Sequence, residues 1–173
     1  MGIDQRLVDA ALELLARRWP GDGWAVAAAV YLDGGEILTS VGLDNVNSGA
    51  SLCAEAGALC QAYTLDRRVT ASVCVGRDEG GAIAVLAPCG ICQERLALWG
   101  PDVQVGIPAD DGWASRSLRE LHPHYWAARD GVWPDAAAHR EKSTASRRKN
   151  PERPRSPRGS VGRRRARARR PRA

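Results

Sequence analysis

The apolar patterning of this chain is confined to residues 1–138, so only this part of the chain can form a hydrophobic core. Residues 139–173 are rich in Arg, Pro and Ser, show no apolar periodicity and end in GRRRARARRPRA. Such a segment cannot bury enough apolar surface to offset the conformational entropy lost on ordering. The sequence therefore predicts one folded domain over residues 1–138 and a disordered Arg/Pro-rich basic tail over residues 139–173.

Charge divides at the same boundary. Residues 1–138 contain 10 Arg, no Lys and 18 acidic residues, a net charge of −8, whereas residues 139–173 contain 15 Lys and Arg against 2 Glu, a net charge of +13. An acidic body excludes a fold that binds nucleic acid through a basic face. Contact with nucleic acid is expected only through the tail, for which a solvated extension without a role is the favoured interpretation.

Membrane and export signals are not evident in the sequence. No apolar run approaches the ~18 residues of a membrane-spanning helix. Residues 1–19 are amphipathic and lack the uninterrupted apolar core of a secretory signal. We therefore expect a cytoplasmic protein that makes no membrane contact.

Hydrophobic periodicity and turn signals divide the body into alternating helices and strands. Antiparallel strands followed by helix–strand alternation favour a mixed sheet that is covered on both faces. The fold class is therefore α/β, with a three-layer α/β/α arrangement. The predicted elements are helices at 4–18, 53–66 and 89–99, a hairpin at 25–43, strands at 69–76, 82–86 and 103–107, and a helical turn at 117–121.

Two short cysteine motifs indicate a metal site. They are Cys53-Ala54-Glu55 and Pro88-Cys89-Gly90-Ile91-Cys92, and each lies at the start of a predicted helix. Free backbone N–H groups at a helix start favour thiolate over thiol. Three thiolates can bind Zn²⁺ and leave its fourth position open for water, as in catalytic zinc sites. Glu55 lies two residues after a ligand and is expected to move protons rather than to bind the metal.

A structural zinc site with a fourth protein ligand is the alternative. Cys60 is the nearest candidate in sequence, but it lies two helical turns, about 10 Å, along the helix from Cys53. It therefore cannot reach the same ion. We expect Cys60 and Cys74 to be buried apolar packing residues.

These motifs resemble those of the zinc-dependent cytidine deaminases, which include the blasticidin S deaminases. WAVAAAVYLDGGEILTSVGL from Trp24 is similar to the opening hairpin of the family, and SLRELHPHYW from Ser117 is similar to its closing segment. The resemblance covers roughly residues 5–127. It implies the three-layer fold given above and hydrolytic removal of an amino group from cytosine.

The resemblance also implies site residues. Cys53, Cys89 and Cys92 correspond to the zinc ligands, and Glu55 corresponds to the catalytic proton carrier. Four positions correspond to the substrate site: Ala54, whose backbone lies against the base; Trp24, a pocket wall; Asp44, at the place of a ribose-binding Glu; and Gly42, at the place of a ribose-binding Asn. Gln93 replaces an Arg that commonly follows the last zinc cysteine.

The predicted activity is zinc-dependent deamination of a free cytosine nucleoside, cytidine or deoxycytidine, within pyrimidine salvage. By resemblance, the enzyme is a homo-oligomer, usually a tetramer. A modified cytosine nucleoside such as blasticidin S is the alternative substrate, which the absence of a side chain at Gly42 favours slightly. A deaminase that acts on nucleic acid and an inactive zinc-stabilised binding module are the remaining alternatives.

Overall fold

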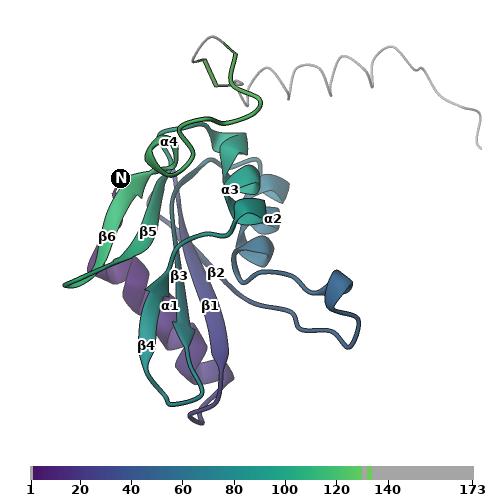
Figure 1. The fold of residues 1–173 in the computed structure, drawn as a ribbon, viewed down its shortest axis with the longest axis vertical. Coiled ribbons are helices and arrows are strands. Elements are labelled where there is room, and N and C mark those ends of the chain that lie inside the picture. The colour runs from purple at the N-terminus through teal and green to yellow at the C-terminus, as the bar shows by residue number, and fades with distance from the viewer. Residues whose placement is uncertain (1, 130–131, 134–173) are drawn as a thin grey trace, which may run out of the picture. The chain divides into compact units, whose positions relative to one another are not determined.

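A mixed six-stranded sheet forms the centre of the computed structural model, which describes residues 2–129 and 132–133. The strand order is β2-β1-β3-β5-β6, and β4 pairs with β3 beside β5 (Figure 1). Only the β3–β5 pair is parallel among these pairings. The strands are β1 (Ala25–Leu32), β2 (Ile37–Val41), β3 (Val69–Arg77), β4 (Ile83–Leu86), β5 (Gln104–Ala109) and β6 (Gly112–Ser117).

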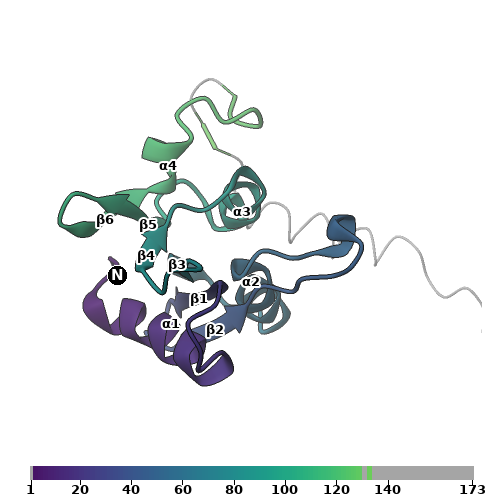
Figure 2. The same cartoon turned by 60° about the horizontal axis from the view of Figure 1, so that its bottom comes forward.

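Helices cover both faces of this sheet. The helix α1 (Gln5–Arg18) packs on one face, and α2 (Glu55–Thr64) and α3 (Gly90–Leu96) pack on the other (Figure 2). Two 3₁₀ turns, η1 (Ser48–Ala50) and η2 (Ala97–Trp99), and the short α4 (Leu118–Leu121) complete the elements. The predicted three-layer α/β/α class is confirmed.

The central strand β1 shows why two layers of helices form. Its side chains point alternately to opposite faces of the sheet. Ala27, Ala29 and Tyr31 pack with the apolar stripe of α1, whereas Val30 and Leu32 pack with α2. A strand buried on both faces has a nearly continuous apolar sequence, and residues 25–32 have that composition.

The predicted elements agree with the structure except at one edge of the sheet. The hairpin at 25–43 and the helix at 4–18 are present, and the two cysteine-bearing helices are shorter than predicted. The strand β6 was not predicted, because it is polar and none of its residues is buried. It becomes a strand by pairing with β5 across the turn at Asp110 and Asp111.

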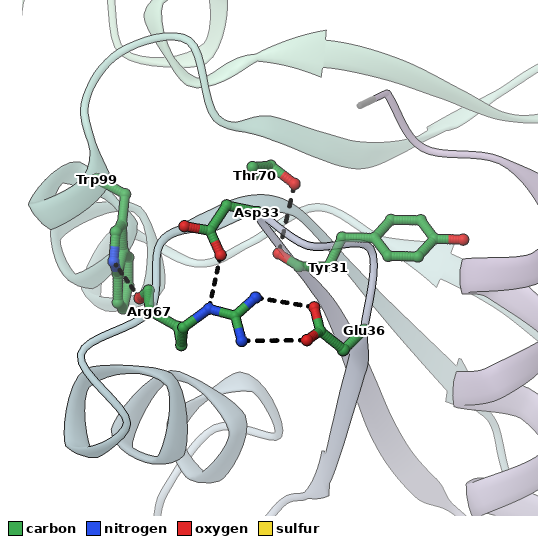
Figure 3. A network of polar contacts seen from close by, with 6 residues as sticks. All are labelled: Tyr31, Asp33, Glu36, Arg67, Thr70 and Trp99. Atoms are coloured by element: carbon green, nitrogen blue, oxygen red, sulfur yellow. Dashed lines mark hydrogen bonds and ion pairs between the residues drawn. The ribbon is translucent and has the colours of Figure 1, made fainter.

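Arg67 joins the β1–β2 turn to the end of α2. Its guanidinium donates to Asp33 at 2.8 Å and to Glu36 at 2.8 and 3.1 Å, and its backbone carbonyl accepts from the indole of Trp99 (Figure 3). Hydrogen bonding to Arg67 lowers the pKa of both carboxyl groups. All three side chains are partly exposed, so these ion pairs orient the turn more than they stabilise the fold.

The basic tail and the absence of a membrane-spanning helix are two further predictions from the sequence. The tail predicted at 139–173 lies outside the described residues, so the division at residue 138 stays a prediction. Within the described part of the chain, the helices are too short or too polar to cross a bilayer.

Asp4 provides a test of how α1 is attached to the sheet. Its Oδ1 accepts from the Leu7 N–H at 3.1 Å and from the buried Tyr31 hydroxyl at 2.9 Å. Asp4→Ala removes both bonds and should lower the free energy of unfolding by about 1–3 kcal/mol. Asp4→Asn retains the accepting oxygen, so its free energy of unfolding, measured by urea denaturation, should stay close to that of the parent. Equal stability of the parent and Asp4→Ala would contradict this role.

Candidate metal centre and substrate cavity

Two helix starts lie side by side at the site (Figures 1 and 2). Cys53 precedes α2, Ala54 occupies its N-terminal cap position and Glu55 is its first residue. Cys89 caps the N-terminus of α3, and Cys92 lies in the first turn of that helix. The fold therefore brings together two motifs that are distant in sequence.

The three cysteine sulfurs form a compact cluster. The Sγ atoms of Cys53, Cys89 and Cys92 all lie within 4.8 Å of one another, and the Cys53–Cys89 pair is 3.5 Å apart. Tetrahedral zinc with Zn–S bonds of ~2.3 Å separates its sulfurs by about 3.8 Å. The donor type, number and spacing therefore fit Zn²⁺. Among the described residues, this is the one group of three or more metal-binding side chains gathered at such distances.

The local environment differs among the three thiols. Burial acts to raise the pKa of Cys89, but hydrogen bonds, including those from the backbone of Cys92 and Ile91, outweigh it and lower this pKa. Burial raises the pKa of Cys53 and Cys92. A divalent cation between the sulfurs would favour the thiolate form of all three.

Glu55 lies against this cluster. Its side chain is only 4% exposed, and its carboxyl group contacts the Cys92 thiol, where its negative charge adds to the effect of burial in raising the pKa of Cys92. The carboxyl group thus lies beside the three sulfurs and also lines the adjoining cavity. This position suits a group that accepts and returns a proton at the metal.

A cavity of about 320 Å³ opens beside the sulfurs. This volume is in the range of small-molecule sites. All the predicted substrate residues line it, and Trp24 is 58% exposed. The lining comprises Trp24, Val26, Gly42, Asp44, Ser51, Leu52, Cys53, Ala54, Glu55, Cys74, Leu86, Ala87 and Cys89.

Two polar side chains outside the sequence motifs hold the site in place. The buried guanidinium of Arg77 donates to the carbonyls of Gly23 at 2.9 Å and Trp19 at 3.0 Å, which fixes the loop before Trp24. The Gln93 amide donates to the Pro88 carbonyl at 2.9 Å, directly before Cys89. Gln93 therefore supports the cysteine loop without adding positive charge.

The two remaining cysteines differ from each other. Cys74 is buried as predicted, and it also lines the cavity. The prediction that Cys60 is buried was wrong, because Cys60 lies on an exposed face of α2. The apolar character of Cys60 gave no reliable signal, because the buried face of α2 consists of Glu55, Ala56, Ala58, Leu59 and Ala62.

Sequence comparison identifies the family. Residues 1–106 match the cytidine and deoxycytidylate deaminase zinc-binding region, and this match covers more than half of the chain. The chain belongs to this family. The predicted resemblance is therefore confirmed, and the three-cysteine cluster agrees with the zinc-binding character of the region.

Individual relatives in this family include two kinds of deaminase. The chain is 38% identical over 78 residues to the cytidine deaminase of Mycobacterium tuberculosis, an alignment that covers 44% of this chain and 56% of the relative. The chain thus spans little more than half the length of that relative. It is 28% identical over 125 residues to the blasticidin-S deaminase of Bacillus cereus, covering 69% and 89% of the two chains.

A solved structure supports the same assignment. The crystal structure of the cytidine deaminase from Bacillus anthracis is similar, with a TM-score of 0.68 and 38% sequence identity. The similarity covers 81% of this chain and 95% of that chain. The arrangement of layers described above is therefore the arrangement of cytidine deaminase structures.

Removal of one cysteine tests the metal centre. Cys89→Ala leaves two thiols and should reduce zinc content from about one ion per chain to a small fraction, because zinc sites need at least three protein ligands. Cys60→Ala is the matched control and should retain zinc fully. Atomic absorption of the purified, dialysed proteins measures both. Full zinc occupancy in Cys89→Ala would exclude Cys89 as a ligand.

Proposed function

We propose that this protein hydrolyses the amino group of a free cytosine nucleoside, with cytidine or deoxycytidine giving the corresponding uracil nucleoside and ammonia. The observation that supports this most strongly is the buried Glu55 carboxyl group, which lies against the three-cysteine cluster and lines a cavity of nucleoside size. Cys53, Cys89 and Cys92 would bind Zn²⁺. When bound, this ion supplies a water that is acidic enough to lose a proton near neutral pH.

Glu55 then performs the proton transfers. Its carboxylate accepts a proton from the attacking water and delivers it to N3 of the base, which makes C4 more electrophilic. The oxygen of this water forms a bond to C4. Glu55 then accepts the remaining proton of that oxygen and transfers it to the amino group at C4, so that the C4–N bond breaks with release of ammonia. One water is consumed, the product has a carbonyl at C4, and no electrons are transferred.

The cavity residues bind and orient the base and its sugar. Buried Ala54 brings its backbone to the cavity wall, and Trp24 supplies an aromatic surface. Asp44 offers a carboxylate to sugar hydroxyl groups. Gly42 leaves space beside it, since even an added Cβ would be 3.5 Å from the nearest heavy atom, the Leu52 carbonyl oxygen. We propose these substrate roles together with the ligand and Glu55 assignments.

The charge of the cavity favours a nucleoside over a nucleotide. Within residues 2–129 and 132–133, the lining contains the carboxyl groups of Asp44 and Glu55 and no Lys, Arg or His. A phosphate group would face like charge there without a cationic partner. The distinction between nucleoside and nucleotide matters here, because the name of the matched region covers deaminases of cytidine, a nucleoside, and of deoxycytidylate, a nucleotide.

A modified cytosine nucleoside with a cationic substituent is the second candidate substrate. An exposed carboxylate at Asp44 and open space at Gly42 would accept such a substituent. Similarity to the Bacillus cereus blasticidin-S deaminase over 69% of this chain supports the same candidate. Parallel assays with cytidine, deoxycytidine and blasticidin S distinguish the two.

Three wider properties belong to the same proposal. The three ligand thiols require a reducing compartment, which supports a cytoplasmic location. The cavity opens to solvent beside the exposed side chains of Trp24, Leu52 and Leu86, and a second copy that covers them would complete a homo-oligomer. The reaction is of the class used in pyrimidine salvage.

Substitution of Glu55 tests the mechanism. Glu55→Gln preserves shape but cannot transfer protons, so ammonia release from cytidine should fall by about 10²–10⁴-fold or more while zinc is retained. Glu79→Gln, at an exposed acid in the β3–β4 turn, is the control and should equal the parent. Activity of Glu55→Gln within a few-fold of the parent would exclude Glu55 as the proton carrier.

The same assay separates the remaining functional classes. A zinc-loaded parent that releases ammonia from DNA or RNA but not from nucleosides would favour a nucleic-acid deaminase. A zinc-loaded, folded parent that releases ammonia from none of these substrates would favour a binding module.

Asp44 tests the preference for nucleosides. The parent should have a kcat/KM for cytidine at least about tenfold above that for cytidine 5′-monophosphate, because the phosphate meets a carboxylate. Asp44→Asn removes this charge and should narrow the ratio, whereas Asp110→Asn, in the exposed β5–β6 turn, should leave it unchanged. An unchanged ratio in Asp44→Asn would show that Asp44 does not select against phosphate.

A further inference from the structure

Ser40 makes an unusual contact with the first turn of α2. Its hydroxyl donates to the Ala54 carbonyl and accepts from the Ala58 N–H at 2.8 Å. Ser40 lies on β2, opposite Ala28 of β1. Ala28 packs with Ala54 and Cys74 beneath the metal centre. The strand and the helix start are therefore joined directly at the site.

The Ser40 hydroxyl bonds to the Ala54 carbonyl and the Ala58 N–H, two groups that would bond directly to each other in a regular helix. In an α-helix, the N–H of residue 58 donates to the carbonyl of residue 54. A side chain that enters this ladder bends or opens the turn that it enters. The turn affected here begins at Ala54, directly after Cys53, and includes Glu55. Its geometry therefore determines where the Cys53 sulfur and the Glu55 carboxyl group point.

Gly57 makes the contact possible. A Cβ atom built at Gly57 would lie 2.8 Å from the Ser40 Cβ and 3.3 Å from its Oγ, and the first of these distances is too short for two carbon atoms. Glycine within a helix is destabilising relative to alanine. The chain therefore has a destabilising residue at a position in α2 where a larger residue would displace Ser40.

We propose that Ser40 is a positioning residue, which holds the first turn of α2 so that Cys53 and Glu55 both face the metal. Ser40 does not line the cavity described above, so it acts through α2 and not on the substrate. The effect on turnover rests on the proposed deaminase function. The effect on metal retention rests only on the assignment of Cys53 as a metal ligand and is independent of the reaction.

Ser40→Ala is the first test. It should release zinc to a competing chelator about tenfold faster than the parent. It should also lower kcat for cytidine by about 10–100-fold, the scale of a misplacement near 1 Å, while KM changes by less than about threefold. Thr64→Ala is the matched control, because it removes a hydroxyl that donates to the Cys60 carbonyl at 2.8 Å at the far end of the same helix. The control should match the parent in both measurements.

Gly57→Ala is the second test and separates positioning from stability. Alanine favours the helix, so a residue without a positioning partner would stabilise the protein and leave function intact. If Ser40 positions the turn, the new methyl group displaces it and Gly57→Ala should reproduce the faster zinc release and the lower kcat of Ser40→Ala. This result also decides the proposal if Ser40→Ala does not fold.

These experiments distinguish failure of the Ser40 proposal from failure of the proposed deaminase function. Folded Ser40→Ala and Gly57→Ala proteins with parental zinc release and parental kcat would overturn the proposal. A parent that releases no ammonia from any cytosine nucleoside would refute the deaminase function, and the zinc-release comparison would still decide the role of Ser40. If Thr64→Ala also released zinc faster than the parent, the effect would be a general one on α2, and the proposed role of Ser40 would be overturned.

Discussion

The close approach of α2 to the sheet is the contact on which the site depends. Small residues make it possible, because Ala28 of β1 and Ala54 of the helix start pack directly together, and Gly57 leaves room for Ser40. Bulkier side chains at these positions would move the helix away from the sheet. Cys53 and Glu55 would move with it, and the distance to Cys89 and Cys92 on α3 would increase. Packing of small side chains thus determines the spacing of the sulfurs.

Negative charge is the second constraint on this site. Three thiols and the carboxyl groups of Glu55 and Asp44 lie in or beside one cavity, and the described part of the chain contributes no cationic side chain to its lining. Backbone N–H groups lower the pKa of Cys89, but burial and the nearby carboxyl group keep that of Cys92 raised. A bound divalent cation resolves this imbalance. The same charge pattern is the basis of the proposed preference for a nucleoside over a phosphorylated substrate.

Sequence patterns predicted the elements that have strong local signals. The apolar run at 25–32, the turn at Asp33 and the helix ended by Pro20 are each defined within a few residues, and all are present in the structure. The strand β6 was missed because its half-exposed residues have no apolar alternation, and it exists only through pairing with β5. The exposure of Cys60 was also mispredicted, since helical periodicity alone does not tell which face of an Ala-rich helix is buried.

By itself, the sequence determined the chemistry that is available: three cysteines at two helix starts, a Glu beside one of them, and the family to which these motifs belong. This is because ligand type and helix-start position are local properties. Only the tertiary structure decided how these groups meet, through the packing of α2 and α3 on one face of the sheet. It also revealed Ser40, Gln93 and Arg77 as supports of the site, because each acts through backbone atoms of a distant or differently folded segment. Hydrogen bonds to the backbone of a distant segment leave no residue-type pattern in the sequence, and they become visible only when the chain has folded.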